Sequence, residues 1–241
     1  MWKRVSRKDA KAQRAQVDVF KKGKLKLELW TATLQMTQQP SALTKANVDA
    51  NPIRQFQVWY DEVRAHGVSE QDSISMTLAT ASQDGDPDAR IVLLKSFDDS
   101  GFVFYTNYKS RKAKELNENP RACLLFYWAK VWRQVRIEGA VEKVSETESE
   151  AYFQSRPLGS RLSAWASNQS EVIDSREILE ARFVELQTRF GNNVPRPPHW
   201  GGYRVKPHAI EFWQGQENRM HDRLRYRLQE NGVWLIERLG P

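Results

Sequence analysis

The middle of the chain, residues 73–144, is a succession of short strand-like segments separated by turn signals. The first segment alternates apolar and polar residues over 73–81, and the acidic, glycine-containing run 83–87 that follows is typical of a turn. The same pattern predicts further strands over residues 89–97, 102–106, 122–128 and 132–144. Many short strands in close succession favour a barrel or a sandwich.

Helices are predicted on both sides of this strand-rich region and within it. Apolar residues recur at helical spacing after Pro52, a favourable first-turn residue, so we expect a helix that ends near Gly67. Shorter helices are predicted over residues 111–117, 147–154 and 175–190. Three more strands are expected within residues 203–239. The fold class that follows is mainly β with helices (α+β).

The positive charge of the chain is confined to its N-terminal segment. Of its 37 Lys/Arg and 30 Asp/Glu residues, ten and three lie within residues 1–30, which leaves 27 of each sign for residues 31–241. A nucleic-acid-binding domain carries its basic surface on the folded part, so we expect no nucleic-acid partner. We interpret residues 1–50 as a basic, poorly ordered extension and arm, and residues 51–241 as the folded domain. The extension could be a targeting segment, an anion-binding arm or disordered chain.

Several classes of protein are disfavoured by the sequence. Its apolar runs, such as 123–127, are far shorter than the ~20 residues that span a bilayer, so we expect no membrane partner. The single cysteine, Cys123, fits a reducing compartment, so we expect a cytoplasmic protein unless the basic extension directs it to an organelle. The four histidines are dispersed and no metal motif occurs, so no metal is expected. The GxGxxG, GxxxxGK[ST] and GxSxG motifs are also absent from the sequence.

The predicted helix at residues 111–117 begins with a motif that could hold an anion. Ser110 is a suitable N-cap, and Arg111 and Lys112 follow it in the first turn. Cations there are unfavourable by about 0.3–1 kcal/mol, unless an anion occupies the helix N-terminus. A solvated helix start is the alternative interpretation.

Two further groups of polar residues could bind phosphate. Arg90 and Lys95 bracket a predicted strand, although strict alternation places them on opposite faces unless a bulge intervenes. Tyr152 and Arg156 are spaced i, i+4, with Ser160 just beyond the expected helix end. An ordinary strand with charged ends and a capped helix with a solvated arginine are the alternatives.

The segment from Arg219 to Arg223 is predicted to lie in a strand. On a strand, Arg219, His221 and Arg223 would face one way, with Met220 and Asp222 on the other face. Three groups that can carry positive charge would then be stacked. Their mutual repulsion favours a bound anion or electron-rich ligand over the alternative of a solvated basic edge strand.

Taken together, these segments resemble the pyridoxamine 5'-phosphate oxidase family. The C-terminal runs 210–215 and 219–223 look like that family's most specific motif. Earlier segments match in order and approximate spacing, namely 90–95, Tyr105-Thr106, 110–112, Gln134, 152–160, 168–170 and 200–202. The resemblance spans residues 51–241.

The resemblance implies an FMN-binding split β-barrel that forms a homodimer, with FMN at the subunit interface. By family analogy, the residues that contact FMN are Arg90, Lys95, Tyr105, Thr106, Arg111, Lys112, Gln134, Gln169, Ser170, Trp213 and Arg223. Those that hold the substrate are Lys95, Tyr152, Arg156, Ser160, Arg219 and His221. Of these, Arg219 and His221 are also the catalytic candidates.

The activity implied by the resemblance is oxidation of pyridoxamine 5'-phosphate or pyridoxine 5'-phosphate to pyridoxal 5'-phosphate. Hydride would pass from the substrate's C4' carbon to flavin N5, with O2 as electron acceptor and H2O2 as product. One departure is that residues 31–50 lack the Arg and Tyr with which family members often close over the substrate. The alternatives are another split-barrel flavin oxidoreductase, such as a flavin reductase, and a non-catalytic pyridoxal phosphate- or flavin-binding protein.

Overall fold

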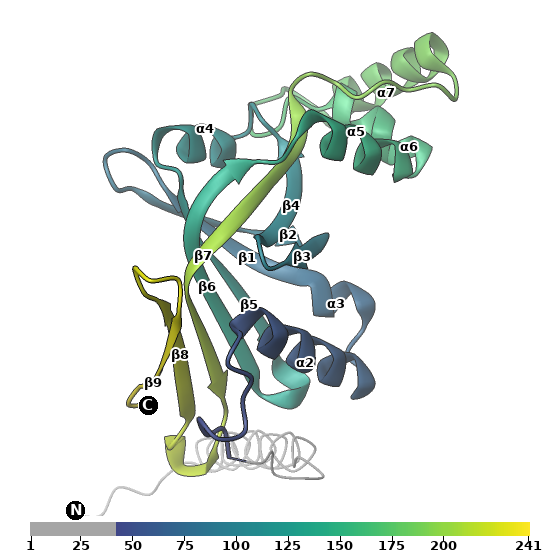
Figure 1. Cartoon of the computed structure of the whole chain (residues 1–241). Coiled ribbons are helices and arrows are strands. Elements are labelled where there is room, and N and C mark those ends of the chain that lie inside the picture. Colours follow the sequence, from purple (N-terminus) through teal and green to yellow (C-terminus); the bar gives the residue numbers. More distant parts are fainter. Residues whose placement is uncertain (1–41) are drawn as a thin grey trace, which may run out of the picture. The chain divides into compact units, whose positions relative to one another are not determined.

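Antiparallel strands dominate the computed structural model, which describes residues 42–241 (Figure 1). They form one sheet in the order β2-β1-β5-β6-β7-β4-β3, and β8 and β9 extend it from β7. The strands are β1 (Ser75–Ala81), β2 (Pro87–Leu93), β3 (Ser96–Asp98), β4 (Gly101–Asn107), β5 (Arg121–Trp128), β6 (Arg133–Lys143), β7 (Trp200–Gln214), β8 (Asp222–Leu228) and β9 (Trp234–Arg238). Residues 1–41, which make up most of the expected basic extension, lie outside the described residues.

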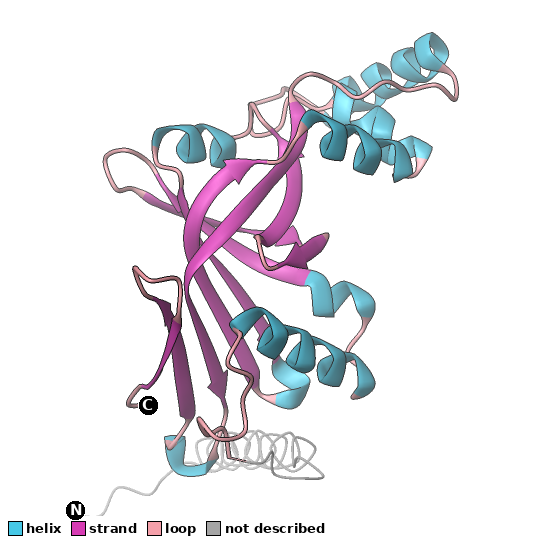
Figure 2. Cartoon of the chain, viewed as in Figure 1, coloured by secondary structure: helices cyan, strands magenta, loops and turns pink. Residues whose placement is uncertain are grey.

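The helices gather at two places along the curled sheet (Figure 2). α2 and α3 lie beside its lower half in this view, whereas α4 to α7 lie around its upper end. Their bounds are α2 (Pro52–Ala65), α3 (Glu70–Ile74), α4 (Arg111–Glu118), α5 (Glu146–Ser155), α6 (Leu158–Ala166) and α7 (Arg176–Phe190), with short 3₁₀ helices η1 (Ala129–Val131) and η2 (Glu217–Arg219). The expectation of a mainly β fold with helices is confirmed.

The long strand β7 changes partners along its length. Its first half pairs with β4 and its second half with β8, while β6 runs beside both halves. The β6–β7 register shifts between Glu138 and Gly139, which leaves His208 as the extra residue of a β-bulge. A Cβ atom on Gly139 would lie 2.2 Å from the Lys206 carbonyl oxygen, so the bulge requires glycine there.

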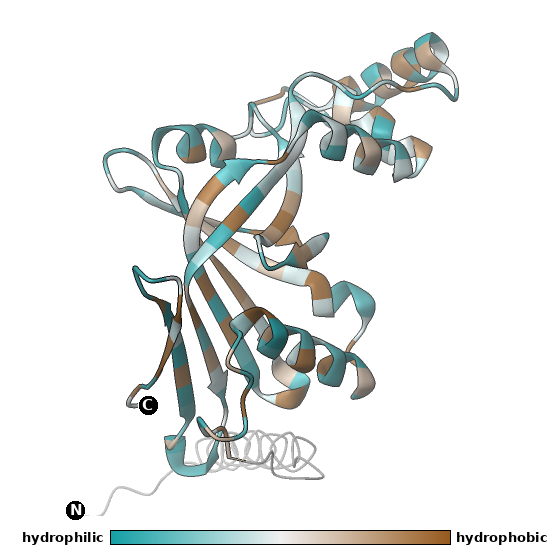
Figure 3. Ribbon diagram, in the orientation of Figure 1, coloured by the Kyte–Doolittle hydropathy of each residue, from teal (hydrophilic) through white to brown (hydrophobic). Residues whose placement is uncertain are grey.

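The bulge also resets which residues of β7 face the core. The buried core positions are odd-numbered before the bulge and even-numbered after it, namely Tyr203, Val205, Ile210 and Phe212. The outward positions change accordingly, so odd-numbered residues of the second half face away from the core. Figure 3 shows the resulting alternation of hydrophilic and hydrophobic residues along the strands.

Helix α2 covers the core of the sheet's lower half. Asn51 caps it, because its side chain accepts the N–H of Ile53 at 2.7 Å, and Pro52 occupies the first turn. Phe56 and Trp59 are buried against the sheet, and the Phe56 ring meets that of Phe102 edge to face at 4.9 Å. Burying each such side chain stabilises the fold by about 1.5–3 kcal/mol. The helix expected after Pro52 is confirmed.

Residues 42–50 pack against the domain, although the sequence placed them in a poorly ordered arm. Leu43 is buried, and Val48 packs against the main core. The Tyr226 hydroxyl donates to the Asp49 carbonyl oxygen at 2.7 Å. These contacts join residues that are far apart in the sequence, so the polar local pattern of this segment concealed them.

Near the cavity described below, one predicted boundary is wrong and one helix was not predicted. The strand expected over 89–97 ends at Leu93 and resumes only at Ser96, because the Leu94 N–H donates to Ile74 whereas the Lys95 N–H donates to Val103. The helix expected over residues 147–154 is confirmed as α5, which ends before Pro157. No helix was predicted for the segment that follows, where Pro157 serves as the N-cap of α6.

The prediction that Arg219, His221 and Arg223 share one strand face is wrong. Arg219 lies in η2, and β8 begins only at Asp222. Asn218 and Arg219 have positive φ angles of 54° and 61°, which a strand does not allow. The alternating pattern of residues 219–223 is typical of a strand, but the backbone turns sharply before β8 begins.

Within residues 42–241, no helix combines the length and the apolar character that a bilayer crossing requires.

Candidate active site

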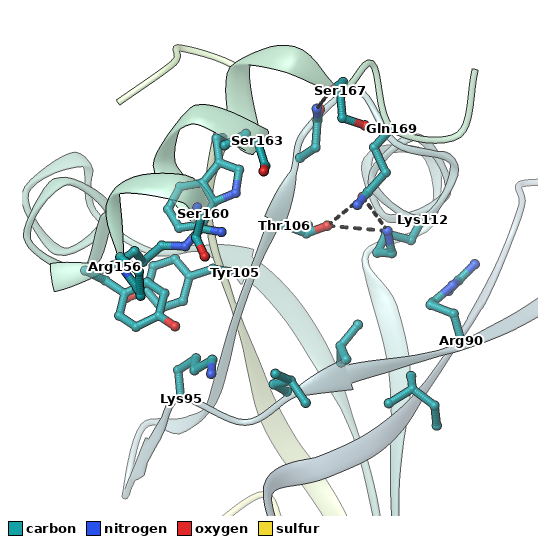
Figure 4. Close-up of a pocket in the computed structure, with 18 residues that line it drawn as sticks. Arg90, Lys95, Tyr105, Thr106, Lys112, Arg156, Ser160, Ser163, Ser167 and Gln169 are labelled. Carbon is teal, nitrogen blue, oxygen red and sulfur yellow. Dashed lines mark hydrogen bonds between the residues drawn. The ribbon is translucent and has the colours of Figure 1, made fainter. Parts of the chain in front are cut away.

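A cavity of about 770 Å³ lies between strands β2 and β4 and the helices α4, α5 and α6 (Figure 4). Four cationic side chains line it, and the described residues contribute no carboxylate to its lining. The cations are Arg90, Lys95, Lys112 and Arg156. The strand breaks after Leu93, so Arg90 and Lys95 reach the same cavity. Strict alternation along an unbroken strand would have placed them on opposite faces. A cavity with this lining attracts anions.

The N-terminus of α4 contributes a buried cation. Ser110 precedes the helix but donates its hydroxyl to the Asn107 carbonyl oxygen at 2.7 Å, so its side chain does not cap the helix. Lys112 Nζ lies 2.8 Å from the Gln169 side-chain oxygen, and Thr106 completes this small network (Figure 4). Burial, reinforced by Arg90, lowers the pKa of Lys112 to about 8. A bound anion would favour its charged form.

Two carboxylates outside the cavity lining, Asp88 and Glu115, form ion pairs with Arg90 and Arg111 near the N-terminus of α4. Arg90 forms ion pairs with Asp88 and with Glu115, whose Oε2 lies 3.1 Å from Arg90 Nη2. Arg111 donates through Nε to Glu115 at 2.9 Å, and its side chain is 62% exposed. Hydrogen bonds from Thr80, Arg111 and Arg90 outweigh the effect of burial and hold the pKa of Glu115 below its usual value. Glu115 therefore stays charged and fixes both guanidinium groups.

The opposite wall combines an arginine with stacked aromatic rings. The rings of Tyr105 and Tyr152 are 4.0 Å apart, and that of Trp200 lies 5.5 Å from Tyr105. Arg156 lies over Trp200, with 4.6 Å from its Cζ to the ring centroid. The Nη1 atom of Arg156 is buried and has no hydrogen-bond partner within the described residues. Burial lowers the pKa of this guanidinium.

That unpartnered nitrogen provides a test of whether an anionic ligand fits the cavity. Leaving a buried donor unsatisfied costs about 1–3 kcal/mol, and more for a charged group. A phosphate oxygen would satisfy it with a charge-assisted bond. Ser160, in the first turn of α6, lines the same wall. The residues present therefore fit a phosphorylated ligand.

A second cluster of predicted site residues lies on the outer face of the sheet. Gln134, Trp213 and Arg223 occupy neighbouring positions across β6, β7 and β8. The His221 ring lies 4.7 Å from that of Trp213, and Arg219 lies two residues before His221, on the exposed η2 turn. The arrangement places a hydrogen-bonding side chain, two aromatic rings and two cations around one surface.

The two clusters lie at opposite ends of β7, the long strand that runs from the upper helices to the lower end of the sheet in Figure 1. Trp200 lines the cavity, whereas Trp213 belongs to the second cluster. These two residues are thirteen steps of about 3.3 Å apart along the curved strand β7. The cavity gathers Arg90, Lys95, Tyr105, Thr106, Lys112, Tyr152, Arg156, Ser160 and Gln169. Two predicted residues lie outside its lining but next in sequence to residues within it, Arg111 and Ser170. Within one chain, the second cluster cannot reach a ligand in the cavity.

Sequence reasoning missed part of the lining. Asn107, Ser163 and Ser167 also line the cavity, the last two from α6 and its C-cap. The small residues at 160, 163, 164 and 167 recur at helical spacing, a signal that could have revealed this face. Among residues 42–241, no group of three or more His, Cys, Asp or Glu side chains is placed to hold a metal ion.

Comparisons with known proteins agree with this geometry. Residues 61–190 match the family described as pyridoxamine 5'-phosphate oxidase, and residues 200–241 match its C-terminal dimerisation region. The chain belongs to the pyridoxamine 5'-phosphate oxidase family. The second match covers β7, β8 and β9, the strands that carry the second cluster.

Curated members of the family are close relatives. The chain is 54% identical over 210 residues to a pyridoxine/pyridoxamine 5'-phosphate oxidase of Cupriavidus metallidurans, a match that covers 87% of this chain and 98% of the relative. It is 58% identical over 200 residues to the enzyme of the same name from Nostoc punctiforme, which covers 83% and 92% of the two chains. These proteins are named as pyridoxine/pyridoxamine 5'-phosphate oxidases.

Solved structures share the fold. PhzG from Burkholderia lata, solved with tetrahydrophenazine-1-carboxylic acid, is 33% identical with a TM-score of 0.78, covering 85% of this chain and all of that one. A pyridoxamine 5'-phosphate oxidase-related, FMN-binding protein from Nostoc punctiforme is 17% identical with a TM-score of 0.64, covering 77% and 97%. The expected split-barrel fold is confirmed.

Proposed function

We propose that the chain binds FMN and oxidises pyridoxamine 5'-phosphate or pyridoxine 5'-phosphate to pyridoxal 5'-phosphate. Dioxygen would be the electron acceptor and hydrogen peroxide the product. The observation that carries the proposal is a cavity with four cations and no carboxylate among its described lining residues. In a member of this family, such a lining suits two phosphorylated molecules, the cofactor and the substrate.

The α4 end of the cavity would hold the FMN phosphate. Arg111 and Lys112 lie in the first turn of α4, where free backbone N–H groups and the helix dipole favour an anion. Arg90 approaches from β2, already oriented by Asp88 and Glu115. The other residues proposed to contact FMN from this side are Lys95, Tyr105, Thr106, Gln169 and Ser170.

The α5–α6 end would hold the substrate phosphate. Arg156 is the C-cap of α5 and Ser160 lies in the first turn of α6, and the unpartnered Nη1 of Arg156 would donate to a phosphate oxygen. Tyr152 and Lys95 would complete this subsite, since Lys95 Nζ lies 6.0 Å from the Tyr152 ring. Two separate cationic ends thus match two phosphates.

A second copy of the chain would complete the site. The outer-face cluster lies too far along β7 to reach its own cavity, and the strands that carry it match a dimerisation region. We propose a homodimer in which this cluster covers the partner's FMN. Gln134, Trp213 and Arg223 would contact the flavin, and Arg219 and His221 would contact the substrate. A closed two-fold dimer would then hold two equivalent sites.

FMN, when bound, supplies the acceptor for the hydride that leaves the substrate's C4' carbon. The chain's own residues would position the substrate and adjust its charge. Arg219 and His221 would orient the pyridine ring and stabilise charge that develops as hydride leaves. Trp213, against the His221 ring, would limit the water that reaches the reacting face.

One experiment tests the function directly. The full chain is purified, its flavin absorption spectrum is recorded, and peroxide release is measured with pyridoxamine 5'-phosphate and with pyridoxine 5'-phosphate. A yellow protein, or one that becomes yellow with added FMN, and peroxide release with either substrate are the expected results. A protein that stays colourless with FMN, or a flavoprotein that releases no peroxide with either substrate, would contradict the proposal.

A further inference from the structure

The carboxylate of Asp222 joins four segments of the chain next to the second cluster. It is the first residue of β8, and its Oδ2 accepts the N–H of Leu43 at 3.1 Å and the side-chain amide of Gln216 at 2.9 Å. Its Oδ1 accepts Arg238 Nη1 at 2.7 Å, and Arg238 also donates to the Leu43 carbonyl oxygen. The arm, the turn before β8, β8 and the end of β9 therefore meet at one side chain.

This carboxylate is held in its charged form. Its side chain is 15% exposed, and such burial raises the pKa of a carboxyl group. The hydrogen bonds from Arg238, from the Leu43 N–H and from Gln216 outweigh burial, so the pKa of Asp222 lies below its usual value. A fully charged acceptor binds its donors more strongly than a neutral one does.

The neighbouring His221 depends on one of these partners. Its Nδ1 accepts the backbone N–H of Gln216 at 3.1 Å, and its ring packs against Trp213. A neutral imidazole that accepts at Nδ1 carries its proton on Nε2. Among residues 42–241, no hydrogen bond occupies Nε2. The ring therefore presents an N–H donor to the outer face.

Gln216 is the link between the two residues. Its side chain is fixed by Asp222 and its backbone N–H fixes His221, so one residue transmits the position of the carboxylate to the imidazole. The turn that contains it includes two residues with positive φ angles, Asn218 and Arg219. Strained turns of this kind persist only where surrounding contacts determine them.

We propose that Asp222 is a positioning residue that ties the arm at Leu43 to His221 and so sets the tautomer and direction of the His221 ring. Through this contact the arm, which lacks the expected Arg and Tyr in residues 31–50, still acts on the substrate-facing residues. The kinetic consequence rests on the proposed function. The consequence for the imidazole does not depend on any ligand.

The substitution Asp222→Asn keeps the shape of the side chain and removes its charge. An amide offers one accepting oxygen and one donating nitrogen. If the oxygen faces Arg238, the amide nitrogen faces the donors of Leu43 and Gln216, and the reverse orientation abandons Arg238. In the first orientation Gln216 and the Leu43 N–H lose their acceptor, and in the second the contact with Arg238 at the end of β9 is lost.

The ring nitrogens of His221 give a direct readout in the full-length protein without substrate. Two-bond ¹H–¹⁵N correlation spectra distinguish the tautomers, and the His221 signal is assigned by its loss in His221→Asn. Wild-type protein is expected to show the Nε2–H tautomer alone, and Asp222→Asn a mixture of tautomers. Asp49→Asn is the matched control, because Asp49 lies on the same arm and pairs with Arg54 but does not contact Gln216 or His221.

An unchanged tautomer in folded Asp222→Asn would overturn the proposal, as would the Nδ1–H tautomer in the wild type. If Asp222→Asn does not fold, Gln216→Met removes the same link from its other partner and must produce the mixture. In the assay, Asp222→Asn is expected to raise KM for the phosphorylated substrate about tenfold, with FMN affinity within about threefold. A wild-type protein without activity would contradict the proposed function while leaving the tautomer test valid.

Discussion

Glu211 and Arg223 meet diagonally across the β7–β8 ladder, with Glu211 Oε1 accepting from Arg223 Nε at 2.7 Å. A second bond joins Arg223 Nη2 to Glu211 Oε2 at 3.1 Å, and Arg136 donates to the same oxygen at 2.9 Å from β6. The Glu211 side chain is only 4% exposed. One buried carboxylate thus aligns two arginines on the outer face, beside Trp213.

Replacing Glu211 with Gln should destabilise the protein, because it removes the buried counterion of Arg223 and leaves Arg136 paired with Glu138 alone. We expect the free energy of unfolding to fall by about 1–3 kcal/mol in urea titrations. Glu237→Gln is the control, since Glu237 pairs with Arg225 and Arg227 at a more exposed place, and its replacement should cost clearly less stability than that of Glu211. Equal losses in the two variants would show that burial does not strengthen the Glu211 pairs.

Replacing Arg156 with Ala should weaken binding of the phosphorylated substrate. The substitution removes the unpartnered buried nitrogen and the contact with Trp200, so we expect KM for pyridoxamine 5'-phosphate to rise by more than about tenfold. Oxidation of unphosphorylated pyridoxamine, measured in parallel, should change far less. A comparable loss with both substrates would place Arg156 in a structural role.

The pH dependence of FMN binding should report Lys112. Its pKa falls from 10.5 to about 8 in the folded protein, so the amine loses its charge as pH rises through 8 and FMN affinity should fall. Between pH 8 and 10.5 the unfolded chain binds more protons than the folded one, so the stability of the FMN-free protein should rise with pH. Flavin fluorescence titrations and urea unfolding at pH values below and above 8 check both directions. In Lys112→Met, FMN should bind less tightly below pH 8, and both pH effects should disappear.

Replacing Arg219 with Ala should affect turnover while leaving FMN bound. The residue lies on the exposed η2 turn, away from the cavity of its own chain, so its loss should not unfold the protein. We expect kcat to fall by more than about tenfold, with the flavin spectrum unchanged. A near-normal rate would exclude Arg219 from the reaction.

Mixed dimers test whether each site uses residues from two copies. A chain with Arg156→Ala and a chain with Arg219→Ala are both impaired alone, but a hybrid would pair an intact cavity with an intact outer-face cluster at one of its two sites. After equal mixing and reassembly, we expect activity to recover to roughly a quarter of the wild-type value. Activity that remains at the average of the two variants would show that each chain uses its own residues.

Local patterns predicted those parts of the fold that local patterns determine. Phe56, Trp59 and Val63 recur at helical spacing, and α2 forms with that face buried. The strands from β1 to β6 follow alternation and turn residues that are visible within a few positions. The family motif similarly identified nine residues that line the cavity, from Arg90 to Gln169.

Contacts between distant segments account for what the sequence could not predict. The break at Lys95 arises because its backbone bonds to Val103, and nothing in the segment's own pattern reveals that choice. The packing of Leu43 depends on Asp222 and Arg238, far along the chain. The division of the site residues into two clusters is likewise invisible in their order along the sequence, since it depends on the direction and length of β7.

The extra residue at His208 determines which side of the sheet the second half of β7 shows to its surroundings. Without it, Trp213 and Glu211 would turn toward the core, and Ile210 and Phe212 would turn to the surface. A deletion in a loop shortens that loop, but loss of this one position would move every side chain in the second half of β7 to the opposite face of the sheet. The outward position of the Trp213 ring therefore depends on the number of residues in β7 and not only on their identity.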